Sequence, residues 1–294
     1  MQASTRILAP FGHVGISRVH AAIGRLFGVK NDTCISENSF RFTYPSGDYY
    51  WNRLLSQGWN YEPEIDFFLK SFSQVPFVFL DLGANFGFWS ARVGGGLYGE
   101  HLSIAVEPSD FAFGYLQRNS QGLKNEVRAR RFAIDETFGQ KINLYGSRHA
   151  GLSINDMWPG ANKTANSQVE SISIDKLVVV EKISLAKTPL VIKLDVEGAE
   201  LRAIKGATGV LNANSVFIIE DAEKNGVSDA ISTLYNELGC TVYMMHDEKL
   251  TKINSLDAIV AHKRATSTLQ WLGLNLVVTK SLQWTKIIDG IEAS

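Results

Sequence analysis

A carboxylate and two glycines follow a short apolar run near residue 80. Residues 77–87 read Phe-Val-Phe-Leu-Asp-Leu-Gly-Ala-Asn-Phe-Gly, and a helix-like stretch comes next. This order predicts a buried strand, a tight loop and the start of a helix. Because glycine has no Cβ, such a loop can bring the backbone close to a ligand. The loop residues that we expect around this ligand are Asp81, Gly83, Ala84, Asn85 and Gly87.

The spacing of these glycines indicates which ligand the loop suits. A dinucleotide-binding loop has the pattern G-x-G-x-x-G, and a P-loop ends in G-K-[ST]. Here three residues separate Gly83 from Gly87, and neither pattern is present. Asp81 stands where its carboxylate would repel a phosphate and attract a cation. S-adenosylmethionine carries an ammonium and a sulfonium group without a phosphate, so we expect it here; an ordinary strand-to-helix turn is the alternative.

A second apolar run, 102–106, ends in Glu107 and Pro108. Glu107 lies 20 residues after Gly87, and doubly wound nucleotide folds have an acidic side chain at this distance that accepts hydrogen bonds from ribose hydroxyls. A solvated carboxylate at a strand end is the alternative, but a following proline fixes the turn and favours a positioned carboxylate. We therefore include Glu107 and Pro108 in the expected cofactor site.

Several other predicted strands also end in an acid. In open α/β sheets ligands bind beyond the carboxyl ends of the strands, and a purely structural protein has little reason to gather carboxylates that repel one another. The densest segment is 193–200, where either Asp195 or Glu197 could act as a general base, or both could hold a divalent cation. Glu197 and Glu200 also suit the N-terminus of a helix. The acids at strand ends are Asp81, Glu107, Asp135, Asp195 and Glu220.

Strand-like and helix-like segments alternate along the chain, which predicts an α/β fold with a mainly parallel sheet covered by helices on both faces. We expect sheet strands at 77–81, 102–106, 127–134, 189–195, 216–220, 241–245 and 274–279. Further β-type runs are 141–145 and 169–174, and we expect helices at 61–72, 111–120, 200–206 and 228–238. Between the two β-type runs, residues 146–167 form a long segment rich in Gly, Ser and Asn, which is typical of a functional or disordered loop.

The composition favours a globular protein with a large core. The chain has 294 residues, a formal net charge of −1 and 45% hydrophobic residues, so nothing suggests nucleic acid as a partner. Cys34 and Cys240 are far apart and not in metal-like spacing, so we expect a reducing compartment and a cytoplasmic protein. Residues 1–31 are basic and free of acids. They could form an amphipathic helix at a membrane surface, or the same helix could pack on its own domain.

Five segments, in their order and rough spacing, resemble the FkbM family of S-adenosylmethionine-dependent methyltransferases. They are Tyr61–Glu64, Asp81–Gly87, Val106–Pro108, Ser173–Asp175 and Ile192–Glu200. The resemblance implies the Rossmann-like fold of class I methyltransferases, with a mainly parallel seven-stranded sheet. Residues 61–294 would form the methyltransferase domain, and residues 1–60 an N-terminal extension of helix and strand. Members that resemble this chain are mostly O-methyltransferases of sugars, glycoconjugates and natural products.

The resemblance also implies roles for individual residues. It places the 81–87 loop at the methionine end of S-adenosylmethionine and Glu107 at the ribose. Ile134 and Asp135, at the end of the third strand, would border the adenine. Asp195 and Glu197 would face the methyl group and the acceptor, which would be a hydroxyl of a sugar, a glycan or a small molecule.

A hydroxyl acceptor is only weakly acidic, so a base assists the transfer. The candidates for this base are Asp195, Glu197, Glu220 and His246, the last at the end of an apolar run and able to titrate near neutral pH. His149 and Trp158, in the long loop, could close over a sugar. The other hypothesis is a binding protein of the same fold that does not catalyse a reaction and docks a membrane or a partner. An oxidoreductase is disfavoured because the G-x-G-x-x-G pattern is missing.

Overall fold

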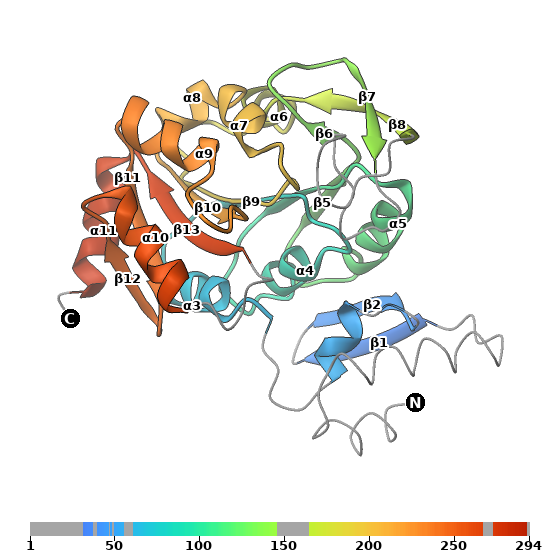
Figure 1. Cartoon of the computed structure of the whole chain (residues 1–294). Coiled ribbons are helices and arrows are strands. Elements are labelled where there is room, and N and C mark those ends of the chain that lie inside the picture. Colours follow the sequence, from blue (N-terminus) through green and yellow to red (C-terminus); the bar gives the residue numbers. More distant parts are fainter. Residues whose placement is uncertain are drawn as a thin grey trace.

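The computed structural model describes residues 32–145, except 38, 39, 47, 49 and 56–60, together with 165–266 and 273–292. An eight-stranded sheet forms the centre (Figure 1). Its strands, in their order across the sheet, are β12 (Lys249–Lys252), β11 (Thr241–His246), β13 (Leu274–Thr279), β10 (Ser215–Asp221), β9 (Leu190–Leu194), β3 (Val78–Leu82), β4 (Ser103–Val106) and β5 (Val127–Arg130).

The five strands from β10 to β5 run parallel, whereas β13 pairs antiparallel with both β10 and β11. The predicted α/β fold with a mainly parallel sheet is therefore confirmed. The sheet has one strand more than the seven predicted, because β12 pairs antiparallel with β11. Asp247 and Glu248 join these two strands with φ values of 50° and 56°. This is the backbone of a tight hairpin, but Asp-Glu is not the Asn-Gly or Asp-Gly signal by which such turns are predicted.

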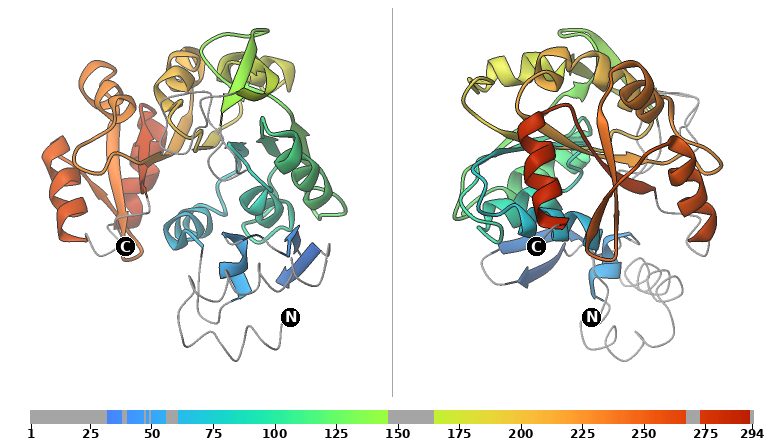
Figure 2. Two further views of the ribbon diagram at one scale, coloured as in Figure 1. Left: turned by 45° about the vertical axis from the view of Figure 1, so that its right-hand side comes forward. Right: turned by 90° about the vertical axis from the view of Figure 1, so that its left-hand side faces the viewer.

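Helices cover both faces of the sheet (Figure 2). Side chains alternate along each strand, so Leu80 and Ile192 pack on one face, and Phe79 and Val191 pack on the other. The first face is covered by α6 (Ile174–Val180), α7 (Glu200–Lys205), α8 (Thr208–Leu211), α9 (Asp229–Ser232) and α10 (Leu256–Ala265). The second face is covered by α3 (Pro63–Ser71), α4 (Phe88–Gly94) and α11 (Leu282–Glu292).

The N-terminal hairpin packs on this second face. It consists of β1 (Asp32–Glu37) and β2 (Phe40–Pro45), followed by the short helix η2 (Trp51–Leu55). Phe42 packs edge-on against Phe88 of α4, with ring centroids 5.3 Å apart. The Thr43 N–H donates to Oδ1 of Asn119, the last residue of α5 (Asp110–Asn119), at 2.8 Å. The hairpin thus shares its apolar core with the central sheet.

The third strand is shorter than predicted. Residues 127–134 form two strands, β5 and the two-residue β6 (Ala133–Ile134), and β6 belongs to a second sheet with β8 (Ala165–Ile172) and β7 (Lys141–Tyr145). The prediction that Ile134 and Asp135 lie at the end of the third strand of the main sheet is therefore wrong. A continuous β-type run does not show that the chain leaves the ladder at Arg131 and Phe132, because both segments have the same local preference.

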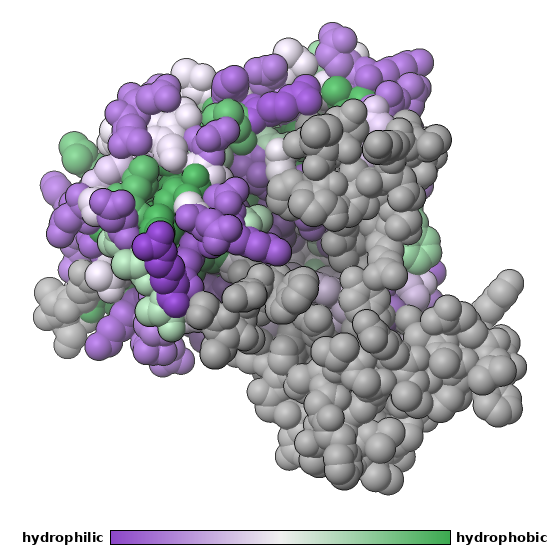
Figure 3. Space-filling model, in the orientation of Figure 1, coloured by the Kyte–Doolittle hydropathy of each residue, from purple (hydrophilic) through white to green (hydrophobic). Residues whose placement is uncertain are grey.

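The predicted helices at 61–72, 111–120 and 200–206 correspond to α3, α5 and α7, whereas 228–238 begins as α9 and continues as the π-type turn η4 (Thr233–Glu237). None of the described helices is long and apolar enough to cross a membrane. The described surface in Figure 3 is mostly hydrophilic, with a hydrophobic area between α9 and α10. Three predictions fall outside the described residues: the basic helix in 1–31, and the roles of His149 and Trp158.

Candidate functional site

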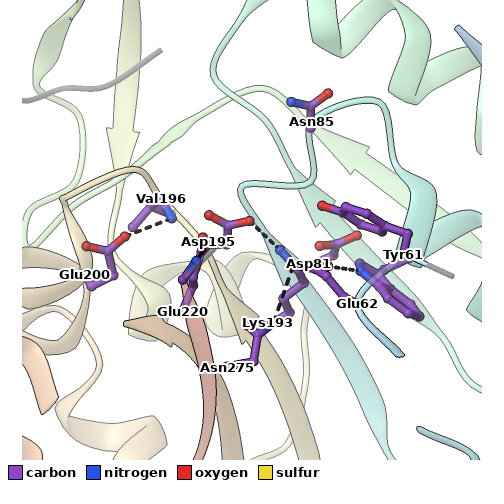
Figure 4. Close-up of polar contacts among 12 residues, drawn as sticks. Tyr61, Glu62, Asp81, Asn85, Lys193, Asp195, Val196, Glu200, Glu220 and Asn275 are labelled. Atoms are coloured by element: carbon purple, nitrogen blue, oxygen red, sulfur yellow. Dashed lines mark hydrogen bonds and ion pairs between the residues drawn. The ribbon is translucent and has the colours of Figure 1, made fainter. Parts of the chain in front are cut away.

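Strand alternation places a lysine and two carboxylates together at the carboxyl end of the sheet. Val191 of β9 packs against the α3 and α4 side, so Lys193 and the following Asp195 point to the same side. In the neighbouring strand β3, Asp81 lies opposite Lys193 in the parallel register. Figure 4 shows these three side chains close to one another. Residues far apart in the sequence thus meet on one face of two adjacent strands.

Strands β10 and β13 extend this group of charges. Glu220 follows Ile218 by two residues and lies on the same face, and it is paired in register with Asn275. The Asn275 Nδ2 donates to Glu64 Oε1 at 2.7 Å and lies 3.5 Å from Glu62 Oε1. Glu62 precedes α3, so the start of that helix adds a further carboxylate to the group of charged side chains at this end of the sheet.

Lys193 is buried among these acids. Its Nζ donates a hydrogen bond to Asp195 Oδ2 at 2.8 Å. Burial alone would lower the pKa of Lys193, but the carboxylates of Asp195, Glu62 and Asp81 outweigh it and raise the pKa above its usual value. The ammonium therefore stays charged at neutral pH and holds Asp195 in place.

The acids around Lys193 and at the end of β4 are harder to ionise than acids in water. Burial raises the pKa of Glu62 to about 7, although Lys193 and the Trp89 indole, which donates to Glu62 Oε2 at 2.6 Å, favour the charged form. Burial also raises the pKa of Glu107 to about 7. The same cause raises the pKa of Asp81 and, together with the charge of Asp195, raises that of Glu220 well above its usual value. The carboxylates also repel one another, and a positively charged ligand would reduce this repulsion.

Asp81 has one satisfied and one unsatisfied oxygen. Its Oδ2 accepts hydrogen bonds from the Ser90 N–H at 3.1 Å and the Ser90 hydroxyl at 2.6 Å, which fixes the first turn of α4. Its Oδ1 is buried and has no hydrogen-bond partner among the residues that the structure describes. A buried carboxylate oxygen without a donor is costly, so this atom fits a cationic or hydrogen-bond-donating ligand such as the ammonium group of S-adenosylmethionine.

The two loop glycines make room for the chain itself. Gly83 has a φ of +83°, and a Cβ there would lie 1.7 Å from the Asp195 carbonyl oxygen. Gly87 has a φ of +81°, and a Cβ there would lie 2.5 Å from Leu116 Cδ1. We expected these glycines to make room for a ligand, but the atoms that a Cβ would meet belong to the protein itself. Gly83 instead lets two loops pack backbone to backbone: residues 81–87, named the cofactor loop for its expected role, and residues 195–199, named the Asp195 loop.

Glu107 is held by the backbone on both sides. Its Oε2 accepts from the Asn85 N–H and its Oε1 accepts from the Ser109 N–H, each at 2.9 Å. Each carboxylate oxygen has a further lone pair, so the side chain can still accept from two neighbouring hydroxyls, as the ribose role requires. Ala84, on the same loop, donates its N–H to the Val106 carbonyl at 2.9 Å, and the Pro108 carbonyl accepts from Arg131 Nε at 3.3 Å.

Left-handed backbone conformations gather at this end of the sheet. Glu62, Asn85 and Glu197 have φ values of 45°, 52° and 52°. Such residues cost about 1–3 kcal/mol each and cluster at functional sites, where the surrounding structure holds them. The start of α3, the cofactor loop and the Asp195 loop each contribute one, which supports placing the site where these three segments meet.

The Asp195 loop is organised by Glu200. The Glu200 Oε1 accepts from the Val196 N–H at 3.3 Å (Figure 4). It also accepts from the Gly198 N–H at 3.1 Å. Glu200 therefore supports the loop at the start of α7, as the alternative interpretation of this acid held. Glu197, between the two N–H groups, is half-buried and close enough to Glu220 for their charges to interact.

Two predicted site residues are engaged elsewhere. Asp135 makes two contacts with Arg202, Oδ1 to Nε at 2.7 Å and Oδ2 to Nη2 at 2.8 Å. His246 is exposed at the end of β11; its Nε2 lies 3.0 Å from Asp247, and its ring contacts that of His262. Because β13 lies between β11 and β10, the structure does not bring His246 to Glu220 and Asp195.

Three residues of this cluster were not predicted from the sequence as site residues. Glu62 belongs to a segment of the family resemblance, which could have marked it, and Lys193 is a charge between two apolar residues of a buried strand. Asn275 has no local signal, because only the antiparallel register of β13 places it beside Glu220. Within the described ranges, no three His, Cys, Asp or Glu side chains form a group that could hold a metal ion.

Replacing Asp81 with alanine should destabilise the folded protein. The change leaves the buried Ser90 N–H and hydroxyl without their acceptor, which costs about 1–3 kcal/mol. Asp81→Asn keeps an acceptor oxygen for Ser90 and should cost less. Urea unfolding of the two variants, followed by circular dichroism, measures the difference. Equal stability of both variants and the unchanged protein would contradict a role of Asp81 in fixing α4.

Comparison with known proteins gives a family match over this region. A family model described as the methyltransferase FkbM domain matches residues 81–248. No curated protein matches the chain. Similar solved structures include methyltransferase FkbM from Methylobacillus flagellatus KT, with 16% identity over 69% of this chain and 43% of that chain, at a TM-score of 0.41. They also include P. horikoshii TYW2 in complex with MeSAdo, with 14% identity over 93% of this chain and 85% of that chain, at a TM-score of 0.39.

The chain thus spans less than half the length of the Methylobacillus protein. With TM-scores below 0.5, both structural likenesses are distant. The family match, by contrast, contains the cofactor loop, Glu107, the 193–200 segment and Glu220 within one continuous range.

Proposed function

The chain belongs to the FkbM family of methyltransferases, and from this premise we propose that it transfers a methyl group from S-adenosylmethionine to a hydroxyl of a sugar, a glycoconjugate or a natural product. The observation that carries the proposal is the buried row of acids around Lys193. A site with this many carboxylates and one buried ammonium suits a ligand with positive charge, and the methyl donor has two such charges.

Two carboxylates would hold the methyl donor. Asp81 would meet its ammonium group, since the Oδ1 is buried without a described partner. Glu107 would accept hydrogen bonds from its ribose, because backbone N–H groups fix both oxygens at the end of β4. The conformation of the loop between them is set by Gly83, Asn85 and Gly87, which all have left-handed φ values.

Asp195 is the base that we propose. Bound S-adenosylmethionine supplies a methyl group that is already activated, so the chain has to orient the acceptor and take up its proton. Orientation of two reactants can lower the barrier by about 7–11 kcal/mol. Asp195 lies just beyond β9 and is only partly exposed, with Lys193 fixing one oxygen and leaving the other for the hydroxyl proton.

Cofactor binding should strengthen as the pH rises through about 7. Glu62 and Glu107 have pKa values of about 7. Only the ionised forms attract a cation by their charge and leave both carboxylate oxygens free to accept hydrogen bonds from two hydroxyl groups. Each ionisation is expected to raise the affinity for S-adenosylmethionine by up to roughly tenfold between pH 6 and pH 8, and the two together by up to about a hundredfold. Isothermal titration calorimetry over this range measures the change. An affinity that stays constant with pH would contradict the placement of these acids at the cofactor.

The free protein should respond to pH in the opposite sense. In the unfolded chain these carboxyls titrate near 4.5, whereas in the folded protein they hold their protons up to about 7. Their contribution to stability is therefore complete below about 4.5 and is lost as the pH rises through 7. Cofactor affinity and the stability of the free protein thus change in opposite directions over the same pH range.

The acceptor is tested by a methyl-transfer screen. The purified full chain is incubated with labelled S-adenosylmethionine and a panel of glycans and hydroxylated metabolites, with and without a chelator. Label in the hydroxyl of a panel member supports the proposal, and label on nitrogen or carbon alone would overturn the O-methyl assignment. If the folded protein does not bind S-adenosylmethionine or S-adenosylhomocysteine at all, the methyltransferase proposal itself fails.

A further inference from the structure

Glu220 lies in an unusual environment for an acid. It is half-buried on β10, and β10 pairs with β9 in parallel register up to Ile219 and Leu194, so Glu220 and Asp195 follow side by side at the ends of these two strands, close enough for their carboxyl groups to interact. Two carboxylates cannot hydrogen-bond to each other unless one of them carries a proton. Asp195 already accepts from the charged Lys193 at 2.8 Å, so the proton belongs on Glu220.

The surrounding charges favour the same assignment. The charges that act on Glu220 are those of Asp195 beyond β9, Glu197 in the following loop and Glu62 before α3, and Glu220 acts in turn on Tyr50 of the N-terminal segment. Lys193 donates a hydrogen bond to Asp195, and its charge also acts on Asp81 and Glu62. A negative charge at Glu220 would therefore add a fourth acid around a lysine that already interacts with three.

One oxygen of Glu220 has a backbone donor, and the chain at Gly273 packs closely against the side chain. The Gly273 N–H donates to Glu220 Oε1 at 3.0 Å. A Cβ on Gly273 would lie 2.2 Å from both Cγ and Oε1 of Glu220. Gly273 precedes β13, so the chain approaches Glu220 at a distance that glycine permits and a larger residue does not.

We propose that Glu220 acts as a neutral acid that donates its proton to a hydrogen bond with Asp195, and that Gly273 holds Glu220 in the orientation that this bond requires. Lys193 and Glu220 then both donate hydrogen bonds to Asp195, and these bonds orient its remaining lone pair toward the acceptor hydroxyl. Glu220 is in this sense a positioning residue and Asp195 is the base. This role rests on the proposed methyl transfer and replaces the earlier hypothesis that Glu220 could itself be the base.

Substitution by glutamine separates the two roles. Glu220→Gln keeps an oxygen for the Gly273 N–H and offers an amide N–H to Asp195, so it should retain methyl-transfer turnover within a few-fold. Glu220→Ala removes the hydrogen bond to a charged partner and should lower turnover roughly 10- to 100-fold. A glutamine variant as inactive as the alanine variant would overturn the proposal, because it would mean that Glu220 works in its ionised form.

The pH profile adds a readout that a merely structural role would not change. At high pH the native Glu220 loses its proton and the two carboxylates repel each other, so kcat should fall on the alkaline side. Glutamine cannot ionise, so this fall should be absent in Glu220→Gln. An identical alkaline limb in both proteins would contradict the proposal.

Gly273→Ala tests the close packing of the chain at Gly273 against the Glu220 side chain. Its Cβ should displace the carboxyl group and lower turnover as Glu220→Ala does, with cofactor affinity unchanged. Gly114→Ala is the matched control, because a Cβ there meets nothing within 4 Å, and it should leave turnover unchanged. Full turnover in Gly273→Ala would contradict the role of Gly273.

One measurement does not depend on methyl transfer. The infrared difference spectrum of the native protein minus Glu220→Gln, taken at pH 8.5 without cofactor, should show the C=O stretch of a neutral carboxyl group, shifted in D₂O. A carboxylate band in its place would overturn the proposal whether or not an acceptor is found. Calorimetric titration with S-adenosylhomocysteine distinguishes this outcome from failure of the proposed function, since only the latter removes cofactor binding.

Discussion

Asp195→Asn is expected to lower the rate of methyl transfer by roughly 10²–10⁴, the usual contribution of a general base. Asparagine has the same shape and can still accept from Lys193, whose Nζ lies 2.8 Å from the native carboxylate. It cannot take up the acceptor proton. Because we propose that Asp195 lies at the acceptor and not at the ribose, the affinity for S-adenosylmethionine should change much less than the rate does.

Initial rates with a saturating acceptor, together with calorimetric titration of the cofactor, separate these two effects. Asp229→Asn is the control, because Asp229 is an exposed acid on α9 that lies outside the site. The rate of this control should equal that of the unchanged protein. If Asp195→Asn kept the full rate, Asp195 would not be the base, and Glu197 would become the candidate to test.

Gly83→Ala should have the largest effect on the structure. Alanine at a φ of +83° is strained, and its Cβ would lie 1.7 Å from the Asp195 carbonyl oxygen. The left-handed backbone costs about 1–2 kcal/mol and crowding in a packed region typically costs about 1–3 kcal/mol, so the loss of stability should reach roughly 2–5 kcal/mol. Moving the two loops apart would also weaken cofactor binding and displace Asp195.

Gly139→Ala separates strain from crowding. Gly139 has a φ of +81°, almost that of Gly83, but a Cβ there meets nothing within 4 Å. It should therefore lose only the backbone contribution, and the difference between the two variants measures the contact between the two loops. Denaturant unfolding gives the stabilities and cofactor titration gives the binding. Equal losses in both variants would show that the loops are not packed against each other as described.

The sequence by itself determined the fold class, most of the strands and the end of the sheet at which the cluster of acids around Lys193 lies. Local periodicity was sufficient for this, because buried parallel strands form continuous apolar runs and their last residues can be read directly from the chain. Thus 274–279 was predicted with the bounds that β13 has, and Asp81, Glu107 and Asp195 were expected at strand ends. The motif residue Asp175 illustrates the limit of such signals, since its carboxylate accepts from the Gly209 and Val210 N–H groups and holds α8.

Only the tertiary structure decided which of these residues meet. The parallel register sets Asp81 opposite Lys193, and the antiparallel register sets Asn275 opposite Glu220. The start of α3 brings Glu62 close to both Lys193 and Asn275. None of these pairings follows from sequence spacing, since each joins residues of different strands or helices. For the same reason the sequence could not show that the partner of Asp135 is Arg202. Residue types determine what chemistry is available, whereas strand register and helix packing determine which groups are close enough to perform it.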